Sequence, residues 1–178
     1  TAAEAEAALA AADSAVELYS GYGKHIVTAL ATINGSAVGI VATEKEAICH
    51  KCTAKAARFV RLCDAYSIPV VTVVNSDGFV KSEGDDEAGG IRQAARMAGV
   101  YAEATTAKVA VLAGEAVGPV YTVFAACADW RVAVQGATIA PLAPETAVSV
   151  LYKDEIYASD NIAEATKAKA AAYAKDVC

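Results

Sequence analysis

Residues 114–121, Gly-Glu-Ala-Val-Gly-Pro-Val-Tyr, combine the residue types that can stabilise a developing negative charge through the backbone. They follow the apolar residues 108–113, which predict a strand, and precede residues 122–129, which predict a helix. A helix N-terminus presents unpaired N–H groups and a partial positive charge, so it can hold an anion or an oxyanion. Pro119 has no N–H and removes one donor. The same spacing also fits an ordinary strand-to-helix turn.

A second glycine-bearing segment runs from Gly78 and Phe79 to Gly89 and Gly90. Here a predicted strand ends, a loop follows, and a predicted helix begins beside two adjacent glycines. Glycine lets a substrate approach the backbone N–H groups closely. A flexible loop with tight helix–sheet packing accounts for the spacing as well, and from spacing alone it is the favoured interpretation.

The cysteines offer weaker signals. Cys49-His50-Lys51-Cys52 has the spacing of a metal or redox motif, but no second such pair completes a zinc site, and ordinary thiols remain the main alternative. An odd count of five without a secretion signal indicates reduced thiols and a cytoplasmic location. The full set is Cys49, Cys52, Cys63, Cys127 and Cys178.

The composition excludes several classes of function. The formal charge of −6 and 56% hydrophobic content predict a globular chain and argue against nucleic acid or an anionic membrane as the main partner. No basic leader precedes the predicted first helix, and Glu115 and Pro119 interrupt the apolar residues 109–128. No glycine-rich nucleotide-binding motif occurs. The arginines Arg58, Arg61, Arg92 and Arg96 could contact phosphate, although each also suits an ordinary surface position.

The pattern of predicted elements indicates a single α/β domain over residues 1–178, with helices packed on a sheet. Asn34-Gly35 predicts a hairpin between its first two strands. The predicted helices cover residues 1–18, 51–66, 85–105, 122–129 and 162–177, with another beginning at Pro144. The predicted strands cover residues 25–33, 37–43, 69–74, 108–113, 131–134 and 137–140.

Taken in order, several segments resemble the carboxyl-terminal half of the carboxyltransferase subunit of biotin-dependent acyl-CoA carboxylases and decarboxylases. The matching segments follow one another in an unbroken order over roughly Val27 to Tyr152 and include Asp77-Gly78-Phe79 and Gly89-Gly90-Ile91-Arg92. The other matching segments are residues 55–66, 67–72, 101–105, 108–109, 118–121, 128–129 and 140–152.

The resemblance implies an α/β fold of the crotonase type, a ββα superhelix. In that family two such halves face each other, one holding an acyl-CoA thioester and the other receiving carboxybiotin. Backbone N–H groups form an oxyanion hole in each half, which is electrostatic catalysis without a side-chain nucleophile. The implied cofactor is biotin on a partner protein, the implied substrate is a CoA thioester, and no metal is implied.

Carried over residue by residue, the biotin-side oxyanion hole falls on Gly118 to Tyr121, where the family has Gly-Gly-Ala-Tyr. Its donors would be the N–H groups of residues 119 and 120, so Pro119 leaves only Val120. The resemblance also assigns Gly78, Phe79, Gly89, Gly90 and Tyr121 to the biotin-binding side. Departures from the family occur at Asp77, Gln93-Ala94-Ala95 and Val134-Gln135.

The resemblance also sets the expected partners. We expect a trimer-type homo-oligomer, a separate subunit carrying the amino-terminal half, or both, together with a biotin carboxyl carrier protein. The family's closing helices and their arginine would follow residue 178. Three functions stay open: a working carboxyltransferase subunit, a non-catalytic structural or regulatory paralogue with a degenerate oxyanion hole, and a single-site crotonase-like hydratase or hydrolase, which is the least favoured.

Overall fold

The computed structural model of the protein describes residues 1–11, 14–159 and 161–177, so Cys178 lies outside the described residues. Its elements are α1 (Ala2–Leu9), β1 (Val16–Glu17), β2 (Ile26–Ile33), β3 (Ser36–Thr43), α2 (His50–Ala65), β4 (Val70–Ser76), α3 (Glu83–Glu87), α4 (Gly90–Glu103), β5 (Lys108–Val117), α5 (Pro119–Phe124), β6 (Trp130–Ala133), β7 (Thr138–Ala140), α6 (Pro144–Leu151), α7 (Lys153–Tyr157) and α8 (Ile162–Val177).

The strands form one seven-stranded sheet in the order β1-β2-β3-β4-β5-β6, with β7 also paired to β5. The first three strands pair antiparallel, and β3, β4, β5 and β6 pair parallel. β6 and β7 share one edge of β5, since β6 pairs with its first half and β7 with Glu115, Ala116 and Val117. This tandem pairing extends β5 to the turn that precedes α5.

The hairpin between β2 and β3 is confirmed. Asn34 and Gly35 have φ values of 49° and 81°, as a two-residue turn with both central residues left-handed requires. Ile33 therefore pairs with Ser36 and Ile26 with Thr43.

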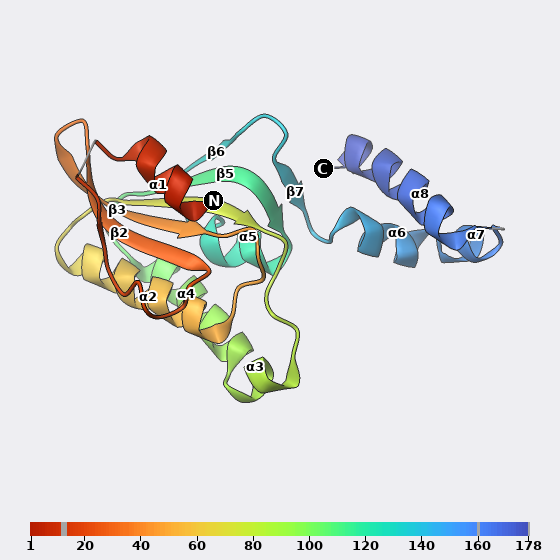
Figure 1. The fold of residues 1–178 in the computed structure, drawn as a ribbon, viewed down its shortest axis with the longest axis horizontal. Coiled ribbons are helices and arrows are strands. Elements are labelled where there is room, and N and C mark those ends of the chain that lie inside the picture. Colours follow the sequence, from red (N-terminus) through yellow and green to blue (C-terminus); the bar gives the residue numbers. More distant parts are fainter. Residues whose placement is uncertain (12–13, 160, 178) are drawn as a thin grey trace.

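Helices cover both faces of the sheet, with α1 on one side and α2 and α4 on the other (Figure 1). The predicted inner face of α2 is confirmed, because Ala56, Phe59, Val60 and Cys63 are fully buried. Gly39 on β3 lets these side chains pack closely against the sheet, because a Cβ at this position would lie 2.5 Å from the Cys63 sulfur. Close packing of this kind leaves little room to move α2 relative to the sheet.

The two longest predicted helices differ from the structure. The helix predicted over residues 1–18 ends at Leu9, because the chain then pairs with the free edge of β2, where Leu18 N–H donates to the Thr28 carbonyl at 2.8 Å. The helix predicted over residues 85–105 is interrupted at Gly89, whose φ of 88° is left-handed. Tertiary pairing and a glycine conformation thus override local helical preference.

The final helices α6, α7 and α8 project away from the sheet as a separate arm (Figure 1). They have a small core of their own, formed by Val148, Ile156 and Ala170 with Tyr173 packed against it. The predicted bounds of α8 and the start of α6 at Pro144 are confirmed.

Candidate functional site

The turn before α5 is built on Gly118. β5 runs to Val117, beyond the predicted end at residue 113, and α5 ends at Phe124 instead of residue 129. Gly118 has φ 54° and ψ −121°, and its N–H donates to the Ala140 carbonyl at 2.7 Å. A Cβ at this position would lie 2.8 Å from the Pro141 carbonyl oxygen. Both backbone conformation and space therefore require glycine here.

Pro119 occupies the first position of α5. Proline suits this position because its N–H would have no intrahelical acceptor and its φ is already helical. The helix is therefore compatible with Pro119, while the turn has one donor fewer. Val120 follows with a buried side chain, and within the part of the chain that the structure describes its N–H forms no hydrogen bond.

The apolar residues 109–128 are divided among β5, the turn at Gly118, α5 and the turn that follows α5. Within the described ranges, no helix has the length and apolar character needed to cross a membrane.

A cleft of about 580 Å³ lies beside this turn. It joins the two glycine-bearing segments, since Gly78 and Phe79 line it together with Gly118 and Pro119. Val120 is not among the lining residues. The remaining walls come from Asp77, Val80, Lys81, Ser82, Glu83, Asp86, Ile91, Val117, Pro141, Leu142, Ala143 and Thr146.

The loop that carries Gly78 and Phe79 is held in place by backbone pairing. Ile48 N–H donates to the Gly78 carbonyl at 3.0 Å, and Val80 N–H donates to the Ile48 carbonyl at 3.1 Å. The Phe79 ring stacks on Phe124 of α5, with centroids 6.4 Å apart. One wall of the cleft is thereby fixed against the helix that forms the other.

Tyr121 lies in a neighbouring hollow of about 610 Å³, which shares Gly118, Pro119 and Pro141 with the cleft. Gly89 and Gly90 line neither space. Gly89 N–H already donates to the Asp86 carbonyl at 2.9 Å, and a Cβ on Gly90 would lie 2.5 Å from an Asp85 carboxylate oxygen. These contacts give both glycines a packing role, and their assignment to biotin binding stays a prediction.

The side chains around the cleft provide charges and hydroxyls, but no His or Cys lines it in the described structure. The Ser82 hydroxyl accepts a hydrogen bond from the Asp85 N–H at 3.2 Å, so it caps α3. The cleft therefore offers a ligand backbone groups, apolar walls and side chains of both charges. Such a site can orient a ligand and stabilise charge without a covalent intermediate.

Cys52 does not provide a low-pKa thiolate. The sulfurs of Cys49 and Cys52 are 3.1 Å apart, and burial raises the pKa of the Cys52 thiol to about 11. His50 Nδ1 lies 2.5 Å from the Asp85 carboxylate, which also accepts the His50 N–H at 3.1 Å. Among the described residues no group of three or more His, Cys, Asp or Glu side chains could hold a metal. The contacts between His50 and Asp85 hold the start of α2 against α3.

Reasoning from sequence missed the wall formed by residues 141–143 and Thr146. Its signal was the Pro141-Leu-Ala-Pro144 segment between a short strand and a helix, because prolines at both ends restrict the connection.

Comparison with known proteins agrees with this architecture. A family model described as carboxyl transferase domain matches residues 4–178. A putative propionyl-CoA carboxylase beta chain of Bacillus subtilis is 37% identical over 174 residues, which are 94% of this chain and 34% of the relative. The methylmalonyl-CoA carboxyltransferase 12S subunit of Propionibacterium freudenreichii is 37% identical over 155 residues, 82% of this chain and 29% of the relative.

A solved transcarboxylase 12S structure, described as a hexamer assembly with methylmalonyl-coenzyme A bound, superposes with a TM-score of 0.89 at 32% identity. It covers 97% of this chain and 34% of that one. The chain thus spans about a third of the length of these relatives, and its α/β fold is of the crotonase type. The chain belongs to the carboxyl transferase domain family of biotin-dependent acyl-CoA carboxylases and transcarboxylases.

Proposed function

We propose that this chain forms the biotin-side half of a split site that transfers a carboxyl group between biotin and an acyl-CoA, in a carboxylase or decarboxylase. One observation carries the proposal: Gly78 and Phe79 share a single cleft with Gly118 and Pro119. These are two separate segments that the family resemblance assigns to biotin binding. Their meeting in one cavity supports that assignment.

The residues present fit biotin in part. Phe79, Ile91 and Leu142 provide apolar walls, and the Val120 N–H is an unpaired donor in the first turn of α5. Biotin, carried by a partner protein, supplies or accepts the carboxyl group in this reaction. The proposed part of this chain is to hold the ring against the turn. The Val120 N–H would stabilise negative charge, although Val120 is fully buried and lines neither hollow in this structure. Two donors would do so more strongly, and Pro119 removes one.

The proposed partners follow from the length and surface of the chain. It spans about a third of its relatives, so the acyl-CoA half belongs to another segment or subunit, and the biotin belongs to a carrier protein. A homo-oligomer of trimer type is proposed as well. The arm supports an oligomer because its exposed apolar side chains are typical of an interface. They include Val150, Leu151, Tyr157 and Ile162.

Pro119 favours a second candidate, a non-catalytic paralogue that keeps the fold and the oligomer contacts. Loss of one oxyanion-hole donor typically lowers a rate by about 10²–10³. The two candidates differ in whether the cleft still performs transfer when the donor is restored.

The test is carboxyl transfer by the complete protein with its biotin carrier and acyl-CoA partner, followed with a radiolabelled carboxyl group. The variants are Pro119→Ala and Pro119→Gly, which both restore an N–H. The control is Pro69→Ala, which also restores an N–H but lies outside the cleft, at an exposed position just before β4. The working subunit predicts measurable transfer and a gain of up to about 10²–10³ in both Pro119 variants. No transfer by any of the proteins would establish the paralogue.

A further inference from the structure

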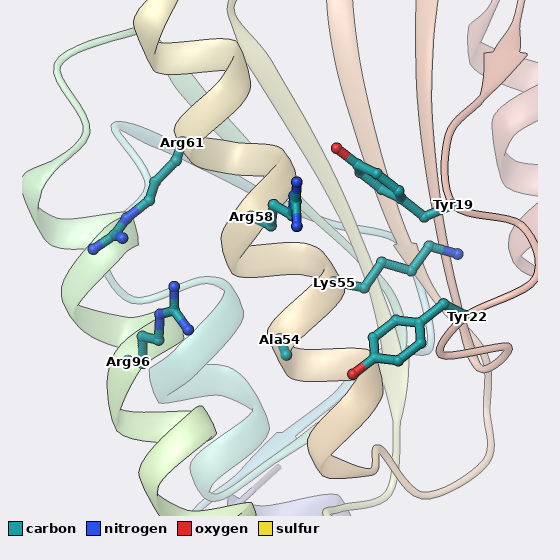
Figure 2. Close-up of a pocket in the computed structure, with 7 residues that line it drawn as sticks. All are labelled: Tyr19, Tyr22, Ala54, Lys55, Arg58, Arg61 and Arg96. Carbon is teal, nitrogen blue, oxygen red and sulfur yellow. The ribbon is translucent and has the colours of Figure 1, made fainter.

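A second hollow, of about 540 Å³, crosses the outer surface of α2 and shares no residue with the cleft. Its walls come from α2, α4 and the turn that follows β1. Figure 2 shows Tyr19, Tyr22 and Lys55 on one side of α2, Arg61 and Arg96 on the other, and Arg58 between them. We call it the arginine groove. Its volume lies in the range of small-molecule sites.

Arg61 shares a small neighbouring hollow with Asp64 and Glu103, but the arginines of the groove are not ion-paired within the described residues. These arginines are Arg58, Arg61 and Arg96, although the chain as a whole carries −6. Arg58 and Arg61 are three residues apart on α2, where like charges repel. Arg96 reaches toward Arg61 from α4 (Figure 2). A multivalent anion placed between these guanidinium groups would relieve the repulsion.

Lys55 differs from the arginines because its charge is already engaged. It is buried, and its Nζ donates to the Ile26 carbonyl at 2.7 Å and lies 3.6 Å from the Glu17 carboxylate. The charges open to a ligand are therefore guanidinium groups. Their planar donor pairs match phosphate oxygens better than an ammonium does.

The other end of the groove is aromatic. The Arg58 guanidinium lies 5.6 Å from the centroid of the Tyr19 ring, and this contact restrains both side chains. Tyr19 has a left-handed φ of 62°, and Tyr22 N–H donates to its carbonyl at 2.9 Å. This tight turn places two partly exposed rings on the groove, where a planar ligand could stack.

We propose that the arginine groove binds a nucleotide, with its phosphates at Arg61 and Arg96 and its base against the tyrosine rings, and adenine nucleotides are the probes of this site. Two kinds of ligand carry this combination of phosphates and base. One is a free nucleoside di- or triphosphate, and the other is the adenosine 3′,5′-bisphosphate portion of coenzyme A. In both kinds of ligand the ribose separates the phosphates from a planar base, and in the groove Arg58 lies between the other arginines and the tyrosine rings.

The test is binding of N-methylanthraniloyl-ATP to the complete protein, followed by fluorescence, with displacement by ATP, ADP, adenosine 3′,5′-bisphosphate and inorganic triphosphate. We expect displacement by a nucleotide well below the concentration needed for triphosphate. Arg61→Gln/Arg96→Gln should raise the Kd by about 100-fold, since each charged hydrogen-bonding group contributes about tenfold. Stronger displacement by ATP and ADP would identify the ligand as a free nucleotide. Stronger displacement by the bisphosphate would identify it as coenzyme A.

A matched control is Lys45→Gln/Lys167→Gln, which also removes two exposed positive charges but lies outside the groove. It should leave the Kd unchanged. Tyr19→Leu should reduce nucleotide binding to the level of triphosphate. The proposal is overturned if the probe does not bind, if triphosphate competes as well as the nucleotides, or if the arginine variant binds like the control while its thermal unfolding is normal.

Discussion

The Gly118 N–H donates to the Ala140 carbonyl at 2.7 Å, so the turn at the start of α5 is tied directly to the end of β7. The next residue after Ala140 is Pro141, whose carbonyl oxygen occupies the space that a Gly118 side chain would need. Two neighbouring chain segments therefore determine the shape of this side of the cleft together. A change at Gly118 should affect both stability and carboxyl transfer.

Gly118→Ala should lower the free energy of unfolding by about 2–4 kcal/mol. A left-handed φ of 54° costs a residue with a Cβ about 1–3 kcal/mol, and the contact with Pro141 adds strain. Urea unfolding of the complete protein measures this loss, and the carboxyl-transfer assay measures the accompanying change in the cleft.

Gly136→Ala is the matched control, because Gly136 also has a left-handed φ, 89°, but no atom lies within 4 Å of its would-be Cβ. Its free energy of unfolding should fall only by the backbone contribution, and it should match the unchanged protein in the transfer assay. Equal losses of stability in the two variants would show that the Pro141 contact is not significant.

Thr72 on β4 and Tyr101 on α4 share a hydrogen bond between their hydroxyl groups, and both residues are fully buried. Tyr101→Phe or Thr72→Val should each cost about 1–3 kcal/mol, because each leaves the other hydroxyl unpaired. The double variant should cost less than the sum of the two. A double-mutant cycle in urea measures this coupling, and strictly additive losses would contradict it.

The same tyrosine predicts a pH dependence at the alkaline end. Burial raises the pKa of Tyr101 to about 12 from 10.0, more than the hydrogen bond to Thr72 lowers it. The folded protein therefore holds this proton more tightly than the unfolded chain. Its contribution to stability is full below about pH 10 and is lost as the pH rises through about 12. The unfolding free energy of Tyr101→Phe should fall less steeply across this window than that of the unchanged protein.

The elements that sequence patterns predicted well are those in which local and tertiary preferences agree. The Asn34-Gly35 turn and the buried face of α2 are of this kind. The pattern failed after Leu9, where alanines favour a helix but Val16 and Glu17 pair as a strand with the free edge of β2. The pattern also predicted too short a strand for β5, because the last residues of β5 are held by pairing with β7. Pairing partners distant in sequence leave no local signal.

For the candidate site, the sequence predicted two glycine-bearing segments but not their spatial relation. That Gly78 and Gly118 meet in one cleft depends on the parallel pairing of β4 with β5 and on Phe79 stacking against Phe124. Gly89 and Gly90 carry the same local signal, yet contacts with Asp86 and Asp85 account for them. Spacing alone cannot separate a glycine needed for packing from one that opens a cleft.

Thiol reactivity should differ sharply among the cysteines. Cys52 and Cys63 have no solvent exposure, and burial raises the pKa of each thiol to about 11, whereas Cys127 is exposed. Because only the thiolate reacts, brief treatment with iodoacetamide at mildly alkaline pH should label Cys127 and spare Cys52 and Cys63. Peptide mass mapping identifies the labelled sites, and labelling in guanidinium chloride is the control in which all three should react. Rapid labelling of Cys52 in the folded protein would revive the redox interpretation of the Cys49–Cys52 pair, because it requires an accessible thiolate at the start of α2.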